Sequence, residues 1–250
     1  MQRTPRPPYP TAAVDWLLGE RPARVLDLGS GKGGFAQMLA AAGHEVFAVD
    51  RSARVCAELR ERLPDARITA ARVEALPFLS CHFDVVTASQ TLHHFAPGLA
   101  LTEIARVLKP GGRIAVAYNS RDDTVPWVKR LLAMTRAADP EAMSGDYGQH
   151  SVATLADSPY FTGLERRNFR NWIPVTRDGL LTMIERRPGT ARLDQSTRQA
   201  LLAEVGQLYD TVARPPEPLL LPFQAACWRA VVDHSQLAIS DDPDAVEIKF

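Results

Sequence analysis

The chain has 250 residues, of which 29 are Lys or Arg and 29 are Asp or Glu, so its formal net charge is zero. This length is sufficient for one full domain with a large core. A balanced charge creates no overall field toward nucleic acid or an anionic membrane, and we expect neither as a partner. The 3 cysteines are too scattered for a disulfide framework or a metal site, which favours a reducing cytoplasm and no bound metal.

The amino-terminal residues 1–22 begin with a proline-rich stretch, Arg3 to Pro10. This stretch cannot be helical, because proline lacks an N–H group and restricts the residue before it. Val14, Leu17 and Leu18 then recur at helical spacing, which predicts a short helix packed on a sheet. We expect no signal peptide and no membrane span, since no apolar run has the required length.

A strand, a glycine-rich turn, a helix and a second strand follow. The short apolar run Val25–Leu28 predicts a buried parallel strand. In the turn Gly29–Gly34, missing side chains let the backbone approach a ligand closely. The predicted helix starts at Phe35 and ends near Gly43, and the next apolar strand closes on Asp50. This unit is typical of the half-site of a nucleoside-binding α/β domain.

Different ligand classes use a turn of this kind, and residue spacing separates them. A phosphate-binding P-loop is excluded, because Lys32 is followed by glycine and not by Ser or Thr. A dinucleotide fold needs G-x-G-x-x-G, which Gly29, Gly31 and Gly34 satisfy, with Asp50 near the expected distance. A nicotinamide-dependent oxidoreductase therefore remains one interpretation.

The fourth predicted strand, Phe83–Ala88, leads into the loop Ser89–Phe95. Ligands of open parallel sheets bind at the carboxyl ends of strands, so we expect this loop to line the site. His93 in the loop is the candidate general base, because imidazole titrates near neutral pH. After a helix over Leu99–Val107, the segment Lys109–Gly112 breaks the chain before a fifth strand.

The second half carries weaker patterns. We place the main domain at residues 1–232, with an irregular cover over the acceptor pocket at residues 140–163 and a peripheral tail at residues 233–250. Phe169 and Trp172 are candidate core residues. The expected elements are a fifth strand over Arg113–Tyr118, a helix from Pro126 to about Ala138, a strand over Glu165–Val175, helices near Asp178–Arg187 and Ser196–Tyr209, and a last strand within Leu219–Val232.

The turn Asp27–Gly33, D-L-G-S-G-K-G, resembles the D-x-G-x-G-x-G motif of class I S-adenosylmethionine-dependent methyltransferases. The L-K-P-G-G break at Leu108–Gly112 is also highly typical of that family and opposes the oxidoreductase interpretation. The resemblance covers about residues 5–128. It implies a doubly wound, seven-stranded, mostly parallel α/β sheet with an antiparallel last strand and a small helical lid.

The resemblance implies S-adenosylmethionine as the cofactor. Asp50 would accept both ribose hydroxyl groups, and the glycine turn would leave room for the methionine half. The segment Arg6–Pro10 resembles the R-P-x-Y-P lead of many small-molecule methyltransferases, which implies that residues 1–22 form a lid arm. The implied cofactor-binding residues are Tyr9, Asp27, Gly29, Ser30, Gly31, Gly33, Asp50, Arg51, Val73, Glu74 and Ser89.

The segment Arg72–Phe78 departs from the family pattern. It resembles G-D-A-x-x-L-P-F, whose Asp usually meets the adenine amino group, but this chain has Arg72 at that place. Glu74 is close enough to substitute for that Asp, and we favour this direct role. If Arg72 instead pairs with Glu74, backbone and apolar contacts would hold the adenine.

The function implied is in-line methyl transfer to a small-molecule acceptor, by a monomer or homodimer. Asn119–Val128 resembles a segment of the branch related to trans-aconitate methyltransferases. His93 would remove a proton from a hydroxyl, amine or carbon acceptor, whereas a carboxylate acceptor would need no base. The alternatives are the oxidoreductase and a non-catalytic S-adenosylmethionine-binding regulatory protein, which Arg72 would favour.

Overall fold

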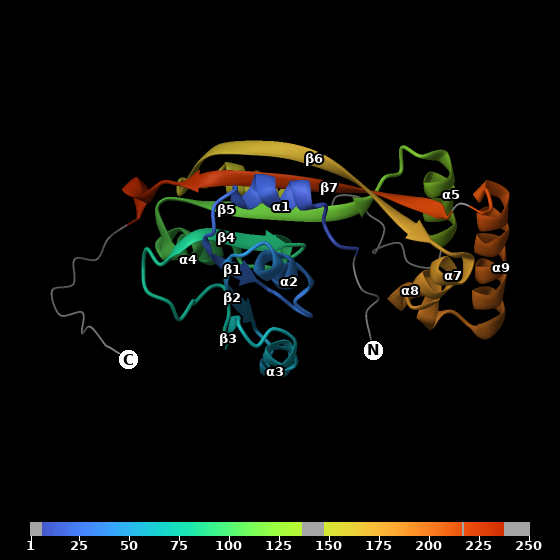
Figure 1. The fold of residues 1–250 in the computed structure, drawn as a ribbon, viewed down its shortest axis with the longest axis horizontal. Coiled ribbons are helices and arrows are strands. Elements are labelled where there is room, and N and C mark those ends of the chain that lie inside the picture. Colours follow the sequence, from blue (N-terminus) through green and yellow to red (C-terminus); the bar gives the residue numbers. More distant parts are fainter. Residues whose placement is uncertain (1–6, 137–147, 217, 238–250) are drawn as a thin grey trace.

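Within the residues that the computed structural model describes, 7–136, 148–216 and 218–237, seven strands form one sheet (Figure 1). Their order is β3-β2-β1-β4-β5-β7-β6, and β7 runs antiparallel to both of its neighbours. The other strand pairs are parallel, so the predicted fold class is confirmed. The strands are β1 (Arg24–Leu28), β2 (Glu45–Asp50), β3 (Arg67–Ala70), β4 (Phe83–Ser89), β5 (Leu108–Arg121), β6 (Phe161–Val175) and β7 (Leu219–Val232).

Helices cover both faces of the sheet, as a doubly wound fold requires. Helices α1 and α2 bury apolar side chains against Val25 and Ala115, and α3 packs on Ala48 on the same face. Helices α4 and α6 cover the opposite face. The helices are α1 (Thr11–Leu18), α2 (Gly34–Ala41), α3 (Ala53–Arg62), η1 (Leu92–His94), α4 (Pro97–Val107), α5 (Pro126–Arg136), α6 (Gln149–Ala156), α7 (Arg177–Glu185), α8 (Pro188–Arg192), α9 (Gln195–Val212) and η3 (His234–Gln236). None of these helices, all within the described residues, is both long and apolar enough to cross a bilayer.

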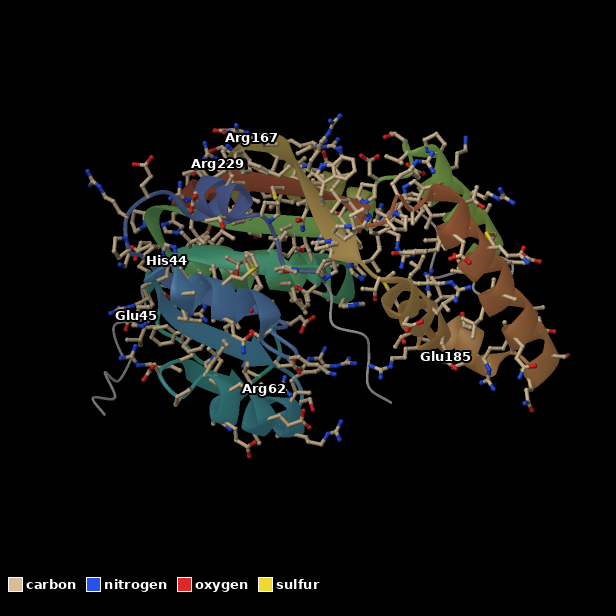
Figure 2. All side chains as sticks on the ribbon, turned by 45° about the vertical axis from the view of Figure 1, so that its right-hand side comes forward. His44, Glu45, Arg62, Arg167, Glu185 and Arg229 are labelled. Carbon is tan, nitrogen blue, oxygen red and sulfur yellow. The ribbon has the colours of Figure 1, made fainter. Side chains whose placement is uncertain are left out.

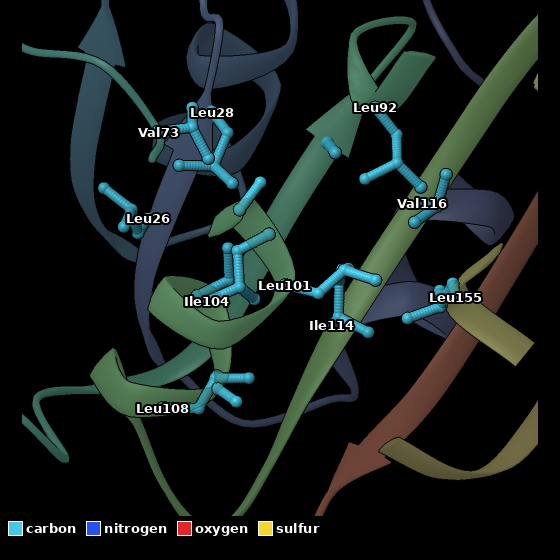
Figure 3. Packing of buried hydrophobic residues seen from close by; sticks show 14 of the residues in the cluster. Leu26, Leu28, Val73, Leu92, Leu101, Ile104, Leu108, Ile114, Val116 and Leu155 are labelled. Atoms are coloured by element: carbon cyan, nitrogen blue, oxygen red, sulfur yellow. The ribbon is translucent and has the colours of Figure 1, made fainter. Parts of the chain in front are cut away.

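The main core lies between α4 and the sheet. Leu101 and Ile104 project from α4 at helical spacing and meet Leu26 and Ile114 of the parallel strands (Figure 3). Ile104, Leu26 and Ile114 have no exposed surface. Burial of one such side chain stabilises the fold by about 1.5–3 kcal/mol, so this cluster fixes the strands whose ends carry the candidate site.

Strand β5 begins earlier than the sequence predicts. The L-K-P-G-G segment was expected to end before the strand, yet β4 already pairs Phe83 with Leu108. The next pair joins Val85 to Arg113, so the intervening residues form a bulge in the ladder. A Cβ on Gly112 would lie 2.8 Å from the Lys109 carbonyl oxygen, which explains why the bulge requires glycine there.

Helices α5, α7, α8 and α9 form a separate unit, here called the helical group, beyond the carboxyl end of β5 (Figure 1). Its core includes Leu131, Ile184 and Val205, each with no exposed surface. A second cluster joins Val128 of α5 to Phe223 of β7, so the helical group packs on the amino-terminal end of β7. The family resemblance also implied a small helical lid, and whether the helical group is that lid stays a prediction.

The described part of the predicted cover at residues 140–163 is regular, not irregular as expected. Val152 and Leu155 of α6 are buried against the main core, and Phe161 already belongs to β6. Residues 140–147 lie outside the described residues. The predicted tail starts with η3, where His234 Nε2 lies 3.0 Å from the Ala105 carbonyl oxygen, and its remainder also lies outside the described residues.

The outer strand β6 corrects one core prediction. The Trp172 side chain is 47 % exposed, because β6 is the edge strand and its neighbour β7 covers only one of its sides. Phe169 is half-buried and packs against Trp16 of α1, with ring centroids 6.2 Å apart. Arg229, which Figure 2 labels, links α1 to this edge of the sheet. It donates to the Trp16 carbonyl oxygen at 2.8 Å and to Glu165 Oε2 at 2.8 Å.

Candidate functional site

The turn after β1 is held by hydrogen bonds to its own strand and to β2. Gly29 N donates to the Val49 carbonyl oxygen at 2.8 Å, and Ser30 Oγ donates to the Asp27 carbonyl oxygen at 2.8 Å. The Asp27 side chain is 1 % exposed and accepts from Thr87 Oγ1 at 2.8 Å. Burial raises the pKa of Asp27 to about 6, while the Thr87 and Ser30 hydrogen bonds oppose that rise.

Two glycines of the turn have different reasons for lacking a side chain. Gly33 has φ of +79°, and a Cβ there would overlap Leu59 of α3. Gly31 has φ of +52°, and the nearest described atom to its ideal Cβ is the Gly29 carbonyl oxygen at 3.8 Å. Packing therefore excludes a side chain at Gly33, whereas Gly31 borders open space that a ligand can use.

Asp50 lies at the end of β2 and faces the turn. Its Oδ2 accepts from Gly31 N at 3.1 Å, and its Oδ1 accepts from Ser52 N at 2.9 Å. A carboxylate has about four lone-pair sites, so these two bonds leave capacity for two hydroxyl donors. The neighbouring Arg51, also predicted to bind the cofactor, is exposed.

Tyr9 is brought to the other side of the turn from far away in sequence. Its hydroxyl group donates to the Ala117 carbonyl oxygen at 3.1 Å and accepts from Ser89 Oγ at 3.1 Å. Its ring meets Phe35 of α2 edge-on, with centroids 5.2 Å apart. The predicted site residues Tyr9 and Ser89 are thus in direct contact, at the carboxyl end of β4.

Residues Pro7–Pro10, here called the strap, are held by two asparagines that sequence reasoning missed. Asn119 Nδ2 of β5 donates to the Pro7 carbonyl oxygen at 3.2 Å. Asn171 Nδ2 of β6 donates to the Pro8 carbonyl oxygen at 2.6 Å. Because prolines lack N–H groups, the strap offers mainly carbonyl acceptors and needs side-chain donors. No local pattern in the sequence marks either asparagine as a partner of the strap.

The loop after β4 is held in place by hydrogen bonds of Gln90, whose backbone is strained. Gln90 is 9 % exposed and has φ of +60°, a conformation that non-glycine residues rarely adopt. Its N–H donates to the Ala117 carbonyl oxygen at 2.8 Å, and its Nε2 donates to that of Asn119 at 3.0 Å. Thr91 Oγ1 donates to the Leu28 carbonyl oxygen at 2.9 Å, which joins the loop to β1. Local strain of this kind gathers at functional sites.

His93 is exposed in η1, directly after this loop, and its backbone and ring both meet Tyr118. Its N–H donates to Tyr118 Oη at 3.3 Å, and its Nδ1 lies 3.2 Å from the same oxygen. Tyr118 is 2 % exposed, and burial raises the pKa of its phenol. Sequence reasoning did not identify Tyr118, because an aromatic residue in an apolar strand is ordinarily a core residue.

The Glu74 carboxylate is engaged with protein groups. Its Oε1 accepts from Ala96 N at 3.0 Å, and Arg72 Nε lies 3.4 Å from its Oε2. The hydrogen bond from Ala96 is the main cause that holds the pKa of Glu74 below its ordinary value. Val73 between them is 5 % exposed and belongs to the main core. This arrangement favours the alternative in which Arg72 pairs with Glu74.

The candidate site is therefore a ring of groups at the carboxyl ends of β1, β2, β4 and β5. In this ring, Asp50 has capacity for two hydroxyl donors, Gly31 borders open space, and the strap contributes the aromatic ring of Tyr9. The described residues contain no group of His, Cys, Asp or Glu that could hold a metal ion.

Comparison with known proteins assigns the family. A family model described as a methyltransferase domain matches residues 26–116, which include the turn, Asp50 and the loop after β4. A protein of Mycobacterium tuberculosis named as an uncharacterized methyltransferase is 32% identical over 230 residues, covering 91% of this chain and 90% of its own. The chain belongs to the class I S-adenosylmethionine-dependent methyltransferases.

Two other matches share the fold or part of the sequence. A putative type II methyltransferase from Anaeromyxobacter dehalogenans has the same fold, with a TM-score of 0.68, 23% identity, and 91% of this chain and 98% of its own covered. The demethylmenaquinone methyltransferase of Beutenbergia cavernae is 40% identical over 141 residues, which are 56% of this chain and 53% of its own. The methyltransferase is accordingly an enzyme, and the oxidoreductase alternative is set aside. The narrower resemblance to the trans-aconitate branch stays a prediction.

Proposed function

We propose that this methyltransferase binds S-adenosylmethionine between Asp50 and the strap and directs its methyl group to a small-molecule acceptor. The observation that carries the proposal is the Asp50 carboxylate. It is fixed by Gly31 N at 3.1 Å and Ser52 N at 2.9 Å and aimed over a turn with open space. A nucleoside presents two ribose hydroxyl groups that fit the remaining acceptor capacity of such a carboxylate.

Other residues fit the rest of the cofactor. The turn at Asp27–Gly33 would lie along the methionine half, with Tyr9 and Ser89 on the far side. Val73 and the backbone near Arg72 would hold the adenine, since the Glu74 carboxylate already binds Ala96 N. A solved Haemonchus contortus phosphoethanolamine methyltransferase, with a TM-score of 0.51 and 21% identity, contains S-adenosylhomocysteine on a similar fold. That structure supports the choice of cofactor.

The bound cofactor would supply the reactive methyl group on its sulfonium. The protein then mainly aligns the acceptor with that methyl group and keeps water out. Strap residues and the helical group lie beyond the carboxyl ends of the strands, where they can do both. In this proposal His93, four residues after Ser89, would lie on the acceptor side.

A small-molecule acceptor is supported by the names of relatives. One relative is the demethylmenaquinone methyltransferase described above. Another is a malonyl-[acyl-carrier protein] O-methyltransferase of Enterobacter lignolyticus, which is 33% identical over 154 residues. Each matches only 56% of this chain, so they support the class of acceptor and not its identity. The cytoplasmic location and the monomeric or homodimeric state stay predictions.

The decisive experiment measures S-adenosylhomocysteine binding by calorimetry for the wild type and Asp50→Asn. Hydrogen bonds to a charged group contribute about 1.5–3 kcal/mol, so the affinity should fall about 10- to 150-fold. Asp65→Asn, on an exposed turn, is the matched control and should bind normally. Circular dichroism establishes that each variant is folded. Unchanged affinity in folded Asp50→Asn would remove Asp50 from the site and with it the proposal.

A further inference from the structure

The strand β6 forms one border of the sheet and has a described neighbour on one side only (Figure 1). It spans 15 residues and pairs with β7 along most of its length. In an edge strand, every second residue directs its backbone N–H and C=O groups away from the sheet. Among the described residues, this side of β6 is therefore open to pairing with an additional strand.

Three exposed arginines, Arg166, Arg167 and Arg170, lie on β6, and Figure 2 labels Arg167 among them. The acid of the strand, Glu165, is bound by Arg229 at 2.8 Å. No ion pair within the described part of the chain involves the three arginines. Because the whole chain has no net charge, this group of arginines, here called the basic border, is a local positive surface.

The basic border presents charge on both faces of the sheet, because side chains alternate along a strand. The guanidinium carbon of Arg166 lies 5.2 Å from the ring centroid of Trp228, on the face that α6 covers. That of Arg167 lies 5.1 Å from the ring centroid of Phe169, on the face that α1 covers. A cation–π contact uses the flat face of the guanidinium group. These contacts therefore hold both groups in place while N–H donors at their rims stay available to carboxylates.

The spacing of the arginines requires an extended occupant with several negative charges. Arg166 and Arg170 share a face and are four residues apart, which is roughly 13 Å along a strand, so one small anion cannot reach both. A nucleic acid spread over that face would miss Arg167 on the opposite face. A polypeptide strand in the plane of the sheet directs its side chains alternately to both faces, so it can place an acid beside each arginine.

A second copy of this chain fits the basic border poorly. If β6 paired antiparallel with β6 of another copy about Asn168, each Arg166 would lie directly opposite an Arg170. Like charges that face each other across two strands destabilise the pairing, and small shifts of register leave the arginines of both copies crowded along one border. An acidic partner makes the same arginines attractive contacts.

We propose that β6 is a docking edge for an acidic, extended segment of a partner protein, which adds a strand to the sheet and pairs its carboxylates with Arg166, Arg167 and Arg170. Trp172 is 47 % exposed on the same face as Arg166 and Arg170 and adds apolar contact area. Arg and Trp are the residue types that most often dominate binding energy at interfaces. In strand addition, backbone hydrogen bonds give affinity and the alternating side chains give specificity.

A designed peptide, T-E-V-T-E-E-T with blocked termini, is the probe. In the antiparallel orientation, which β6 already adopts with β7, its acids lie opposite the three arginines. Calorimetry on the full chain without cofactor should give saturable one-to-one binding that weakens as the salt concentration rises. The matched peptide T-Q-V-T-Q-Q-T should bind about 3- to 125-fold more weakly, because each of three exposed ion pairs contributes roughly 1.4- to 5-fold. No binding of the acidic peptide, or equal binding of both, would overturn the proposal.

Arg166→Gln, Arg167→Gln and Arg170→Gln, combined in one chain, test the border itself. The affinity for the acidic peptide should fall by the same about 3- to 125-fold, since the changes remove the charges and keep exposed polar side chains. Circular dichroism establishes that the variant is folded. If the combined variant does not fold, Arg170→Gln alone takes its place and should weaken binding about 1.4- to 5-fold. Unchanged affinity in either folded variant would overturn the proposal.

The matched control is a chain with Arg130→Gln, Arg186→Gln and Arg192→Gln. These three arginines are exposed on the helical group, so the control makes the same change in total charge far from β6 along the chain. It should bind the acidic peptide as the wild type does. An equal loss in the control would show that the peptide responds to total charge and not to the basic border, which would overturn the proposal.

Two N-methylated forms of the acidic peptide distinguish strand addition from charge attraction. One form carries methyl groups on the odd-numbered amides and the other on the even-numbered amides. An added strand donates through alternate amides, so one form should lose binding while the other keeps it. Equal affinities of the two forms would overturn the added strand.

Two further measurements separate the other possible occupants. Sedimentation of the wild type should show no dimer that the acidic peptide dissociates; such a dimer would assign β6 to a second copy and overturn the proposal. A single-stranded oligodeoxythymidine should bind more weakly than the acidic peptide. Tighter binding of the oligonucleotide, lost in the combined variant of Arg166, Arg167 and Arg170, would assign the basic border to nucleic acid instead.

Discussion

Asp27 combines nearly complete burial with a negative charge at the start of the glycine turn. Burial raises its pKa from 3.8 to about 6, so the folded chain holds this proton more tightly than the unfolded chain does. The resulting stability is fully present below pH 3.8 and is lost as the pH rises through about 6. At about 1.36 kcal/mol for each pKa unit, that shift corresponds to roughly 3 kcal/mol.

Asp27→Asn should therefore stabilise the protein in a pH-dependent way. The amide keeps an acceptor for Thr87 Oγ1 and has no charge to bury. Urea unfolding should give a higher free energy of unfolding than for the wild type at pH 7, by about 3 kcal/mol as an upper bound. The difference should shrink toward zero as the pH approaches 4. A difference that is the same at pH 4 and pH 7 would contradict a buried, titrating carboxyl group.

At the scale of one element, a side chain added at Gly33 of the turn should disturb packing, whereas one added at Gly31 should occupy the space for the ligand. Gly33→Ala should destabilise the fold, because the new methyl group would overlap Leu59 and the backbone has φ of +79°. Gly31→Ala should fold, since its Cβ has no described neighbour nearer than 3.8 Å, at a cost of roughly 1–2 kcal/mol for its left-handed backbone. It should instead weaken S-adenosylhomocysteine binding in calorimetry. Normal binding by Gly31→Ala would show that the ligand does not use this space.

The strap should govern how long the cofactor product stays bound. Asn171→Asp removes the donor to the Pro8 carbonyl oxygen and places a charge beside it, while its size is unchanged. A net hydrogen bond contributes about 0.5–1.5 kcal/mol, so S-adenosylhomocysteine should dissociate about 2- to 10-fold faster in stopped-flow measurements. Asn168→Asp makes the same charge change on the same exposed strand and should leave the rate unaltered. Equal rates for both variants would mean that the strap does not cover the cofactor.

At the scale of the whole molecule, the main core between α4 and the sheet and the core inside the helical group are separate hydrophobic clusters. Ile104 and Ile184 are the same residue type with no exposed surface, and each lies in one of these cores. Each Ile→Ala change should cost about 2–5 kcal/mol. Hydrogen exchange should show faster opening of α5, α7 and α9 in Ile184→Ala, with β1 and β4 still protected. Ile104→Ala should open the sheet. Uniform loss of protection in both variants would mean that the two cores unfold as one unit.

The sequence by itself determined those features that depend on residues close together in the chain. Apolar runs define the parallel strands, and the glycine turn is readable because close backbone approach demands missing side chains. Asp50 could be named as a candidate because an acid that ends a strand after such a turn is a local pattern within one βαβ unit. The family assignment and the parallel sheet followed from these segments, and β7 spans the predicted residues Leu219–Val232.

Only the tertiary structure decided which distant residues meet at the site. Asn171 binds Pro8 from 163 residues away, and Tyr118 binds His93 across 25 residues, so no spacing along the chain could reveal either contact. The sequence left the Glu74 carboxylate two possible partners, adenine and Arg72, and the structure adds a hydrogen bond from Ala96 N at the start of α4, which favours the pairing with Arg72. Hydrogen-bond partners depend on positions that the sheet order creates, and that order is set by the summed packing of the whole core, not by any short segment.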